Sequence, residues 1–171
     1  MRYYRKKGFV IAAEDEATFG LIPTVIRGWA KRGSRPTATI DFQHKCTNVF
    51  GARSTCSFVF WFSKKKKQKN FLEFVRLLLR RWNRVLLFVD GARAHKGAGV
   101  RKFLHCHRKT FRLVYFPKYT PELNPTEQCW KPARKAVANR LLKTVPGLKY
   151  HLNKTFSDKR NMPKIFTYLG D

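Results

Sequence analysis

The sequence predicts an α/β fold with a mixed central sheet and helices on both faces. The segment VLLFV at 85–89 is an uninterrupted apolar run, which is typical of a strand buried on both faces of a parallel sheet. Segments with helical spacing of apolar residues lie on either side of it, at 70–82 and 97–108. Because strands and helices alternate in this way, we expect layers of helices packed on a sheet.

The first third of the chain predicts three strands and one irregular insert. Residues 8–13 form a buried strand that runs into the acidic triplet at 14–16. Residues 20–45 contain glycine, proline and basic residues and predict an insert without regular structure. Two more strands are expected at about 46–53 and 55–62, the second rich in β-branched and aromatic residues.

The second half predicts helices and strands in turn. The helix at 70–82 has Asn70 as its expected N-cap, and a strand at 111–116 follows the helix at 97–108. A last helix begins near Pro125 and places four apolar residues on one face, namely Trp130, Ala133, Val137 and Leu141. Three strands followed by alternating helices and strands is also the order of the RNase H-like fold. We expect one domain over residues 1–146 and a C-terminal extension of undetermined structure at 147–171.

The charge of the chain indicates a polyanionic partner. Its 171 residues include 37 Lys and Arg against 10 Asp and Glu, a net charge of +27. Basic side chains bind nucleic acid by displacing counterions from phosphates, so DNA or RNA is the first candidate. A ribosomal or other structural basic protein is the alternative. No apolar stretch approaches the ~20 residues of a membrane span, so we expect a soluble cytoplasmic, nucleoid-associated protein.

Three of the few acidic residues occupy positions that suit metal binding. Asp90 follows the buried strand at 85–89, Asp15 lies at the end of another predicted strand, and Glu127 lies in the first turn of the last helix. Ligands of open α/β sheets collect at the carboxyl ends of the strands. If the three carboxylates converge there, their mutual repulsion requires cations, and an oxygen-only set suits Mg²⁺ or Mn²⁺.

Each of these acids also has an ordinary structural interpretation. Asp90 with Gly91 could form a simple turn at the end of a strand. Glu127 could belong to a capping box with Asn124 as N-cap and Pro125 at the first helical position. Asp15 lies among three consecutive acids, any of which could be on the surface.

Two segments resemble the DDE transposases of the mariner superfamily, in particular its prokaryotic insertion-sequence branch. They are DGARAHK at 90–96 and FPKYTPELNPTEQCW at 116–130. The resemblance extends to the acidic pair Asp15 and Glu16 and to a Trp-x-x-x-Gly element at 29–33. It implies an RNase H-like DDE endonuclease with Asp15, Asp90 and Glu127 as its catalytic, metal-binding triad.

The resemblance also implies a reaction and partners. A metal-dependent transposase cuts DNA at transposon ends and joins the freed 3′-hydroxyl to target DNA, commonly as a homodimer. The family carries an N-terminal helix-turn-helix region, whereas Met1 here lies just before the first predicted strand. We therefore expect a separate DNA-binding subunit or a missing N-terminal region. Gly91 stands where the family usually has Asn. The alternatives are another RNase H-like nuclease and a non-catalytic, DNA-binding remnant.

Basic residues near the predicted site are the candidate DNA contacts. They lie after Asp90, in the turn after the third strand, and on the last helix: Arg93, His95, Lys96, Lys64, Lys65, Lys66, Lys67, Arg134 and Lys135. His95 matches the histidine of the family segment and could contact either a phosphate or a carboxylate. A solvated charge run is the alternative interpretation of the lysines.

Overall fold

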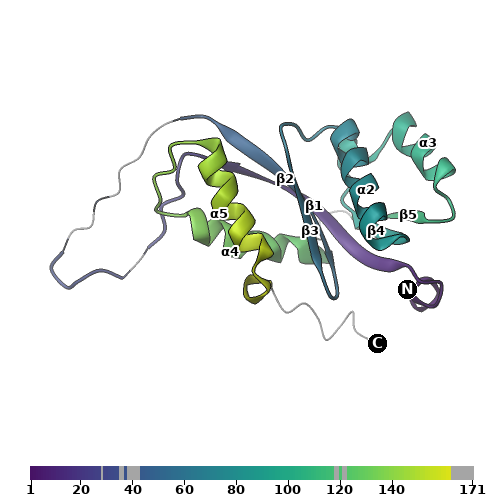
Figure 1. Ribbon diagram of the computed structural model, residues 1–171, viewed down its shortest axis with the longest axis horizontal. Helices are drawn as coiled ribbons and strands as arrows, with labels where there is room; N and C mark the ends of the chain where they lie inside the picture. Colours follow the sequence, from purple (N-terminus) through teal and green to yellow (C-terminus); the bar gives the residue numbers. More distant parts are fainter. Residues whose placement is uncertain (28, 35–36, 38–42, 118–119, 121–122, 163–171) are drawn as a thin grey trace.

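The computed structural model describes residues 1–27, 29–34, 37, 43–117, 120 and 123–162 (Figure 1). Its sheet has five strands in the order β3-β2-β1-β4-β5. Their bounds are β1 Val10–Gly20, β2 Cys46–Ser54, β3 Phe58–Ser63, β4 Val85–Val89 and β5 Phe111–Tyr115. The helices are α1 Arg2–Lys6, α2 Gln68–Trp82, α3 Ala98–Cys106, α4 Pro125–Val137 and α5 Val145–Ser157, with short 3-10 turns at Arg93–His95 (η1) and Lys159–Asn161 (η3).

The sheet is mixed, as predicted. Strand β1 pairs antiparallel with β2 and parallel with β4, and β4 pairs parallel with β5. The strand at 85–89 therefore lies inside the sheet with a partner on each side, which confirms its assignment from the apolar run VLLFV. The middle strand of the five is β1, which carries the acidic triplet.

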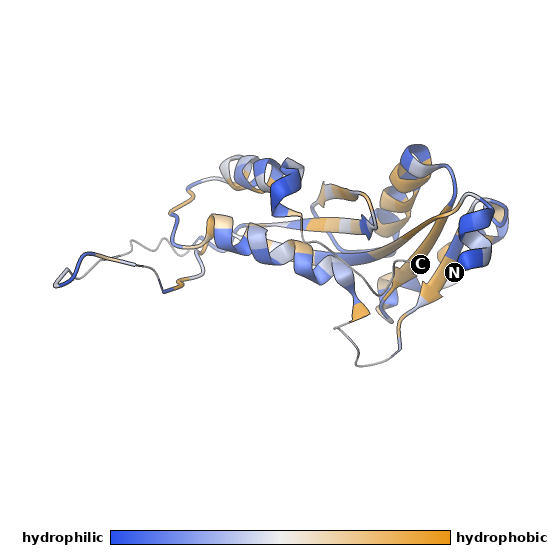
Figure 2. Cartoon of the chain, turned by 90° about the horizontal axis from the view of Figure 1, so that it is seen from below, coloured by the Kyte–Doolittle hydropathy of each residue, from blue (hydrophilic) through white to orange (hydrophobic). Residues whose placement is uncertain are grey.

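Helices cover both faces of the sheet. Alternate strand residues face opposite sides, and in β2 Phe50 belongs to a core cluster with α2 and α3, whereas its neighbour Val49 belongs to a cluster with α4 and α5. Helix α2 contributes Phe71 and Phe74 to the first cluster. Figure 2 shows the hydrophobic colouring concentrated on the strands between these helices. The predicted fold class is confirmed.

Strand β1 is longer than the sequence predicted. The parallel pairing with β4 ends at Ala13↔Phe88, but the antiparallel pairing with β2 continues to Gly20↔Cys46. The prediction that Asp15 ends a strand is therefore wrong, because the residue lies inside β1. It nevertheless lies just beyond the point where β1 loses β4 as a partner, so one side of its backbone is open to other elements.

Several helix boundaries also differ from the prediction. Helix α2 begins at Gln68 and its N-cap is Lys67, so Asn70 lies inside the helix rather than capping it. Leu141 lies beyond the end of α4. Residues 145–157, part of which the sequence left without a structure, form α5 and bury Leu148 and Leu152 against the sheet. In the described part of the chain no helix is long and apolar enough to cross a membrane.

Candidate metal centre

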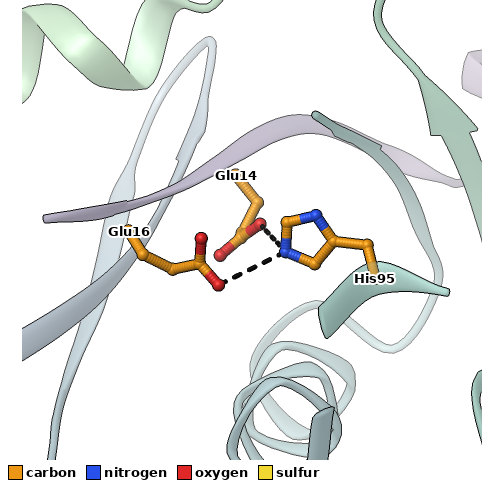
Figure 3. A group of neighbouring side chains, drawn as sticks. All are labelled: Glu14, Glu16 and His95. Carbon is orange, nitrogen blue, oxygen red and sulfur yellow. Dashed lines mark ion pairs between the residues drawn. The ribbon is translucent and has the colours of Figure 1, made fainter. Parts of the chain in front are cut away.

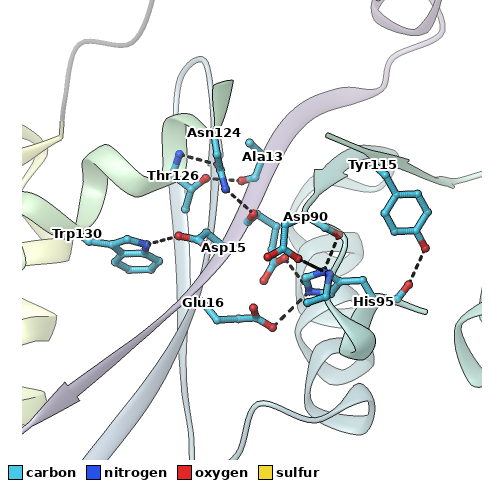
Figure 4. Close-up of polar contacts among 11 residues, drawn as sticks. Ala13, Asp15, Glu16, Asp90, His95, Tyr115, Asn124, Thr126 and Trp130 are labelled. Carbon is cyan, nitrogen blue, oxygen red and sulfur yellow. Dashed lines mark hydrogen bonds and ion pairs between the residues drawn. The ribbon is translucent and has the colours of Figure 1, made fainter. Parts of the chain in front are cut away.

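Asp15 lies on the α4 face of β1 and is held by a tryptophan. Its carboxylate oxygen Oδ2 accepts a hydrogen bond of 2.7 Å from Nε1 of Trp130 on α4 (Figure 4). The residue opposite Asp15 on β2 is Gly51. A Cβ atom at Gly51 would lie 2.5 Å from the Trp130 ring and 2.9 Å from the Phe58 ring. The absence of a side chain at Gly51 thus makes room for the indole that orients Asp15.

We expect Gly51→Ala to lower the free energy of unfolding by about 1–3 kcal/mol, because an overpacked core forces its side chains off their preferred rotamers. The displaced indole would also lose its hydrogen bond to Asp15. Denaturant unfolding measures the loss. Gly20→Ala on the same strand pair is the control, since a Cβ there meets nothing nearer than 3.8 Å. Equal stability of the two variants would contradict the role given to Gly51.

The start of α4 is attached to β1 through two backbone carbonyls. The hydroxyl of Thr126 donates to the Ala13 carbonyl at 2.7 Å, and the Asn124 amide nitrogen donates to the Glu14 carbonyl at 3.2 Å. Asn124 also caps the helix, because its side-chain oxygen accepts from the Thr126 N–H at 3.1 Å. These bonds satisfy buried polar groups and fix the first turn of α4 beside Asp15.

Glu127 occupies that first turn and has an exposed side chain. Asn124 is the N-cap, as the capping-box interpretation expects, but within the described chain Glu127 makes no side-chain bond back to it. The Glu127 carboxylate is near enough to Asp15 to act on its ionisation. Burial first, and then the charges of Glu127 and Glu16, raise the pKa of Asp15 to about 6 against the opposing Trp130 hydrogen bond.

Asp90 lies directly after β4 and has one anchored carboxylate oxygen. Oδ1 accepts from the Ala92 N–H at 2.9 Å and lies 2.8 Å from Nδ1 of His95. The hydrogen bond from His95 is the main cause that lowers the pKa of Asp90. Its side chain is 56% exposed, so the carboxylate stays ionised and open to a ligand.

The structure divides the three predicted acids between two groups. On the α4 face, the charge of Glu127 acts on Asp15. Asp90 interacts with Glu14 and His95 instead. The β1–β4 pairing ends at Ala13↔Phe88, two residues before Asp15 and Asp90. Within the described residues, the cluster whose ligand atoms lie close enough to hold one ion is Glu14, Glu16 and His95, and the three predicted acids do not form such a cluster.

Sequence reasoning missed the second group. Glu14 and Glu16, taken only as neighbours of Asp15, point to the other face of β1 and meet His95 (Figure 3). The Nε2 atom of His95 lies 3.3 Å from Oε2 of Glu14 and 3.3 Å from Oε1 of Glu16. Strand alternation could have found them, because residues 14 and 16 share a face that excludes 15.

Ionisation in this cluster is strongly coupled. Burial lowers the pKa of His95, but the carboxylates of Asp90, Glu16 and Glu14 outweigh it and raise that pKa to about 11. Burial, and next the charge of Glu16, raise the pKa of Glu14 well above its usual range. The ring of His95 packs against Phe71 with centroids 4.5 Å apart, which fixes its orientation.

The predicted DNA contacts are exposed with one exception. The four lysines at 64–67 lie in the turn between β3 and α2, and Arg93, Lys96, Arg134 and Lys135 are also exposed. His95 has no exposed surface, so its assignment as a DNA contact is corrected to a carboxylate contact. Gly91 has no positive φ and a Cβ there meets only the Lys96 amine at 3.4 Å, so the backbone does not require glycine.

Comparisons with known proteins identify the family and the fold of the chain. The model of the DDE superfamily endonuclease family matches residues 11–149. A Mos1 transposase paired-end complex with the left transposon end has a TM-score of 0.68 at 20% identity, over 94% of this chain and 54% of that one. The Mos1 paired-end complex with Mn has a TM-score of 0.69 at 20% identity, over 94% and 54%. The Mos1 catalytic domain alone has a TM-score of 0.63 at 18% identity, over 94% of this chain and 76% of that one. The chain thus shares the RNase H-like fold and spans about half the length of the Mos1 chains in the paired-end complexes. No curated protein matches the sequence.

Proposed function

Because the chain belongs to the DDE superfamily endonuclease family, we propose that it is the catalytic domain of a transposase of the prokaryotic insertion-sequence branch of the mariner superfamily. It cuts DNA at transposon ends and joins the cut end to target DNA. The observation that carries the proposal is the match of residues 11–149 to the family model, and it is supported by Asp15 beside Glu127 and by Asp90 directly after β4. By the resemblance of their segments to the family, we assign these three residues as the DDE triad.

The donor set fits divalent metal. Asp15, Asp90 and Glu127 offer only carboxylate oxygens, and none of the three is fully buried, so Mg²⁺ or Mn²⁺ suits the site better than a softer ion. Mos1 complexes contain Mg and Mn in the same fold. Bound there, such ions would activate water and stabilise the leaving oxygen of a phosphodiester displacement. The chain itself orients two of these carboxylates: Trp130 holds Asp15, and His95 holds Asp90.

The DNA partner is supported by the charge and by its location. The lysine turn at 64–67 and the α4 residues Arg134 and Lys135 are exposed basic groups on elements that adjoin the triad's sheet. The proposal also includes a homodimer. It further includes a separate helix-turn-helix subunit, or an N-terminal region, that recognises the transposon ends. Mos1 forms its paired-end complex with transposon-end DNA.

Binding of this chain to duplex DNA should weaken steeply as salt rises. The slope of log affinity against log salt is about −0.9 for each phosphate neutralised, so several contacts give a slope of several units. Replacing the four lysines at 64–67 by glutamine should reduce that slope by about two to four units. Fluorescence anisotropy at increasing KCl measures it. The matched control neutralises four exposed basic residues on α2 and α3, namely Arg76, Arg80, Arg101 and Lys102, and an equal effect would show that binding has no preferred face.

The test of the proposed function is strand cleavage at the inverted repeats that flank this protein's own gene. The parent protein should nick the end in Mn²⁺ or Mg²⁺, lose that activity in EDTA, and join the cut 3′ end to a second DNA. Nicking without joining would favour another RNase H-like nuclease. Binding without nicking would favour a non-catalytic remnant.

A further inference from the structure

The cluster formed by Glu14, Glu16 and His95 has the geometry of a second metal site. One ligand atom from each residue lies within 4.8 Å of the other two. The two nitrogen-to-oxygen distances from His95 are both 3.3 Å. An ion with bonds of about 2.1 Å separates neighbouring ligands by roughly 3.0 Å in octahedral and 3.4 Å in tetrahedral coordination. The two nitrogen-to-oxygen distances thus match the separation of neighbouring ligands on one ion.

The buried polar atoms of the cluster make no hydrogen bonds and face only one another. Glu14 is 1% exposed, yet neither of its carboxylate oxygens accepts a hydrogen bond, and Nε2 of His95 and Oε1 of Glu16 are buried without one as well. In the described chain no lysine or arginine forms an ion pair with Glu14 or Glu16. Buried polar groups are almost always satisfied, so these atoms indicate a ligand between them.

The second nitrogen of His95 is arranged as in metal-binding histidines. Nδ1 lies 2.8 Å from the Asp90 carboxylate (Figure 4), which leaves Nε2 facing Glu14 and Glu16 (Figure 3). A histidine that ligates metal through one nitrogen usually donates the other N–H to a carboxylate or carbonyl. The Tyr115 hydroxyl donates to the His95 carbonyl at 2.8 Å and holds the same turn.

We propose that Glu14, Glu16 and Nε2 of His95 bind a divalent transition-metal ion, Mn²⁺ or Zn²⁺, at a site distinct from the Asp15–Asp90–Glu127 centre. Two carboxylates neutralise one divalent ion, and ligand atoms of this kind exchange their protons for the metal. The imidazole nitrogen favours Mn²⁺ or Zn²⁺ over Mg²⁺, which takes oxygen ligands. The ion ties β1 to the turn after β4, and through His95 it fixes Asp90.

A nitrogen ligand distinguishes this site from the oxygen-only triad. Mn²⁺ alone is added to the full chain without DNA, and electron spin-echo envelope modulation reports whether an imidazole nitrogen coordinates it. The double variant Asp15→Asn/Glu127→Gln, which disables the triad, should keep the ¹⁴N modulation. Glu14→Gln and Glu16→Gln should each lose it and weaken this Mn²⁺ binding by about 10- to 100-fold or more. Asp158→Asn, a surface change, is the matched control and should keep it.

The outcome does not depend on the chain being a transposase, because the nitrogen signal is read without DNA and nicking is scored separately. Circular dichroism checks that each variant is folded. Absence of ¹⁴N modulation in the parent protein overturns the proposal. So does modulation that persists in folded Glu14→Gln and Glu16→Gln, because the nitrogen would then come from a histidine outside this cluster.

Discussion

Asp90→Asn is expected to reduce strand nicking by about three orders of magnitude or more while the fold and DNA affinity stay close to those of the parent. The substitution preserves size and removes the carboxylate that directly follows β4 and contacts His95. Asp15→Asn and Glu127→Gln should behave alike, because an in-line displacement between two ions needs the full charge set. DNA affinity is retained because it depends on the basic surface. The measurement is single-turnover nicking of the transposon end in Mn²⁺.

The controls are acids outside the site. Glu73→Gln on α2 and Asp158→Asn after α5 should nick at the parental rate. Anisotropy confirms that each variant still binds DNA. If Asp90→Asn nicks as fast as the parent protein, the triad assignment fails, whatever the comparisons of fold suggest.

Most of the fold follows from local patterns in the sequence. The apolar run VLLFV identified an interior strand, and helical spacing identified α2 and α4. The extent of β1 could not be predicted this way, since its second half is stabilised by pairing with β2, a contact between segments more than 25 residues apart. Helix α5 was missed although Leu148, Leu152 and Phe156 recur every four residues, because basic and polar residues separate them.

The candidate site was predicted in part, for a related reason. The motif identified which acids matter, but it did not give the direction of each side chain. Strand alternation places Asp15 with Trp130 on one face and Glu14 with His95 on the other, and the bend after β4 turns Asp90 toward His95. No pattern in the sequence indicates that Gly51 contributes to the site. Its role becomes visible only when β2 and α4 are packed together.

The half-buried carboxylate of Asp15 should make the metal-free protein less stable at neutral pH than the same protein without that charge. Its folded pKa is about 6, against 3.8 for the free group. The folded state therefore holds a proton that the unfolded state has released between these values, and stability falls as pH rises through that window. The shift of about two units corresponds to about 3 kcal/mol above pH ~6.

Asp15→Asn should remove this cost. We expect the free energy of unfolding of the variant to match that of the parent near pH ~4 and to exceed it by up to about 3 kcal/mol at pH ~7.5. Denaturant unfolding across this range, with EDTA present, measures the difference. Asp158→Asn should show no such gain, because the hydrogen bonds from Arg160 lower the pKa of Asp158 rather than raise it. If the difference in the free energy of unfolding between Asp15→Asn and the parent does not increase with pH, then burial does not destabilise the ionised form of Asp15.

Added metal should make the parent protein more stable than Asp15→Asn, which is the reverse of their order without metal. An ion that binds only the folded state stabilises it in proportion to the logarithm of its concentration over its dissociation constant. Mn²⁺ should therefore stabilise the parent protein at pH ~7.5 more than it stabilises Asp15→Asn, which lacks one ligand of the triad. An ion at the cluster of Glu14, Glu16 and His95 would stabilise both proteins equally and cancels in the comparison. Burial and the charge of Glu127 thus destabilise the Asp15 carboxylate when no metal is bound, and the same two features favour binding of a cation there. Asp15→Asn should therefore lose activity and gain stability in the absence of metal.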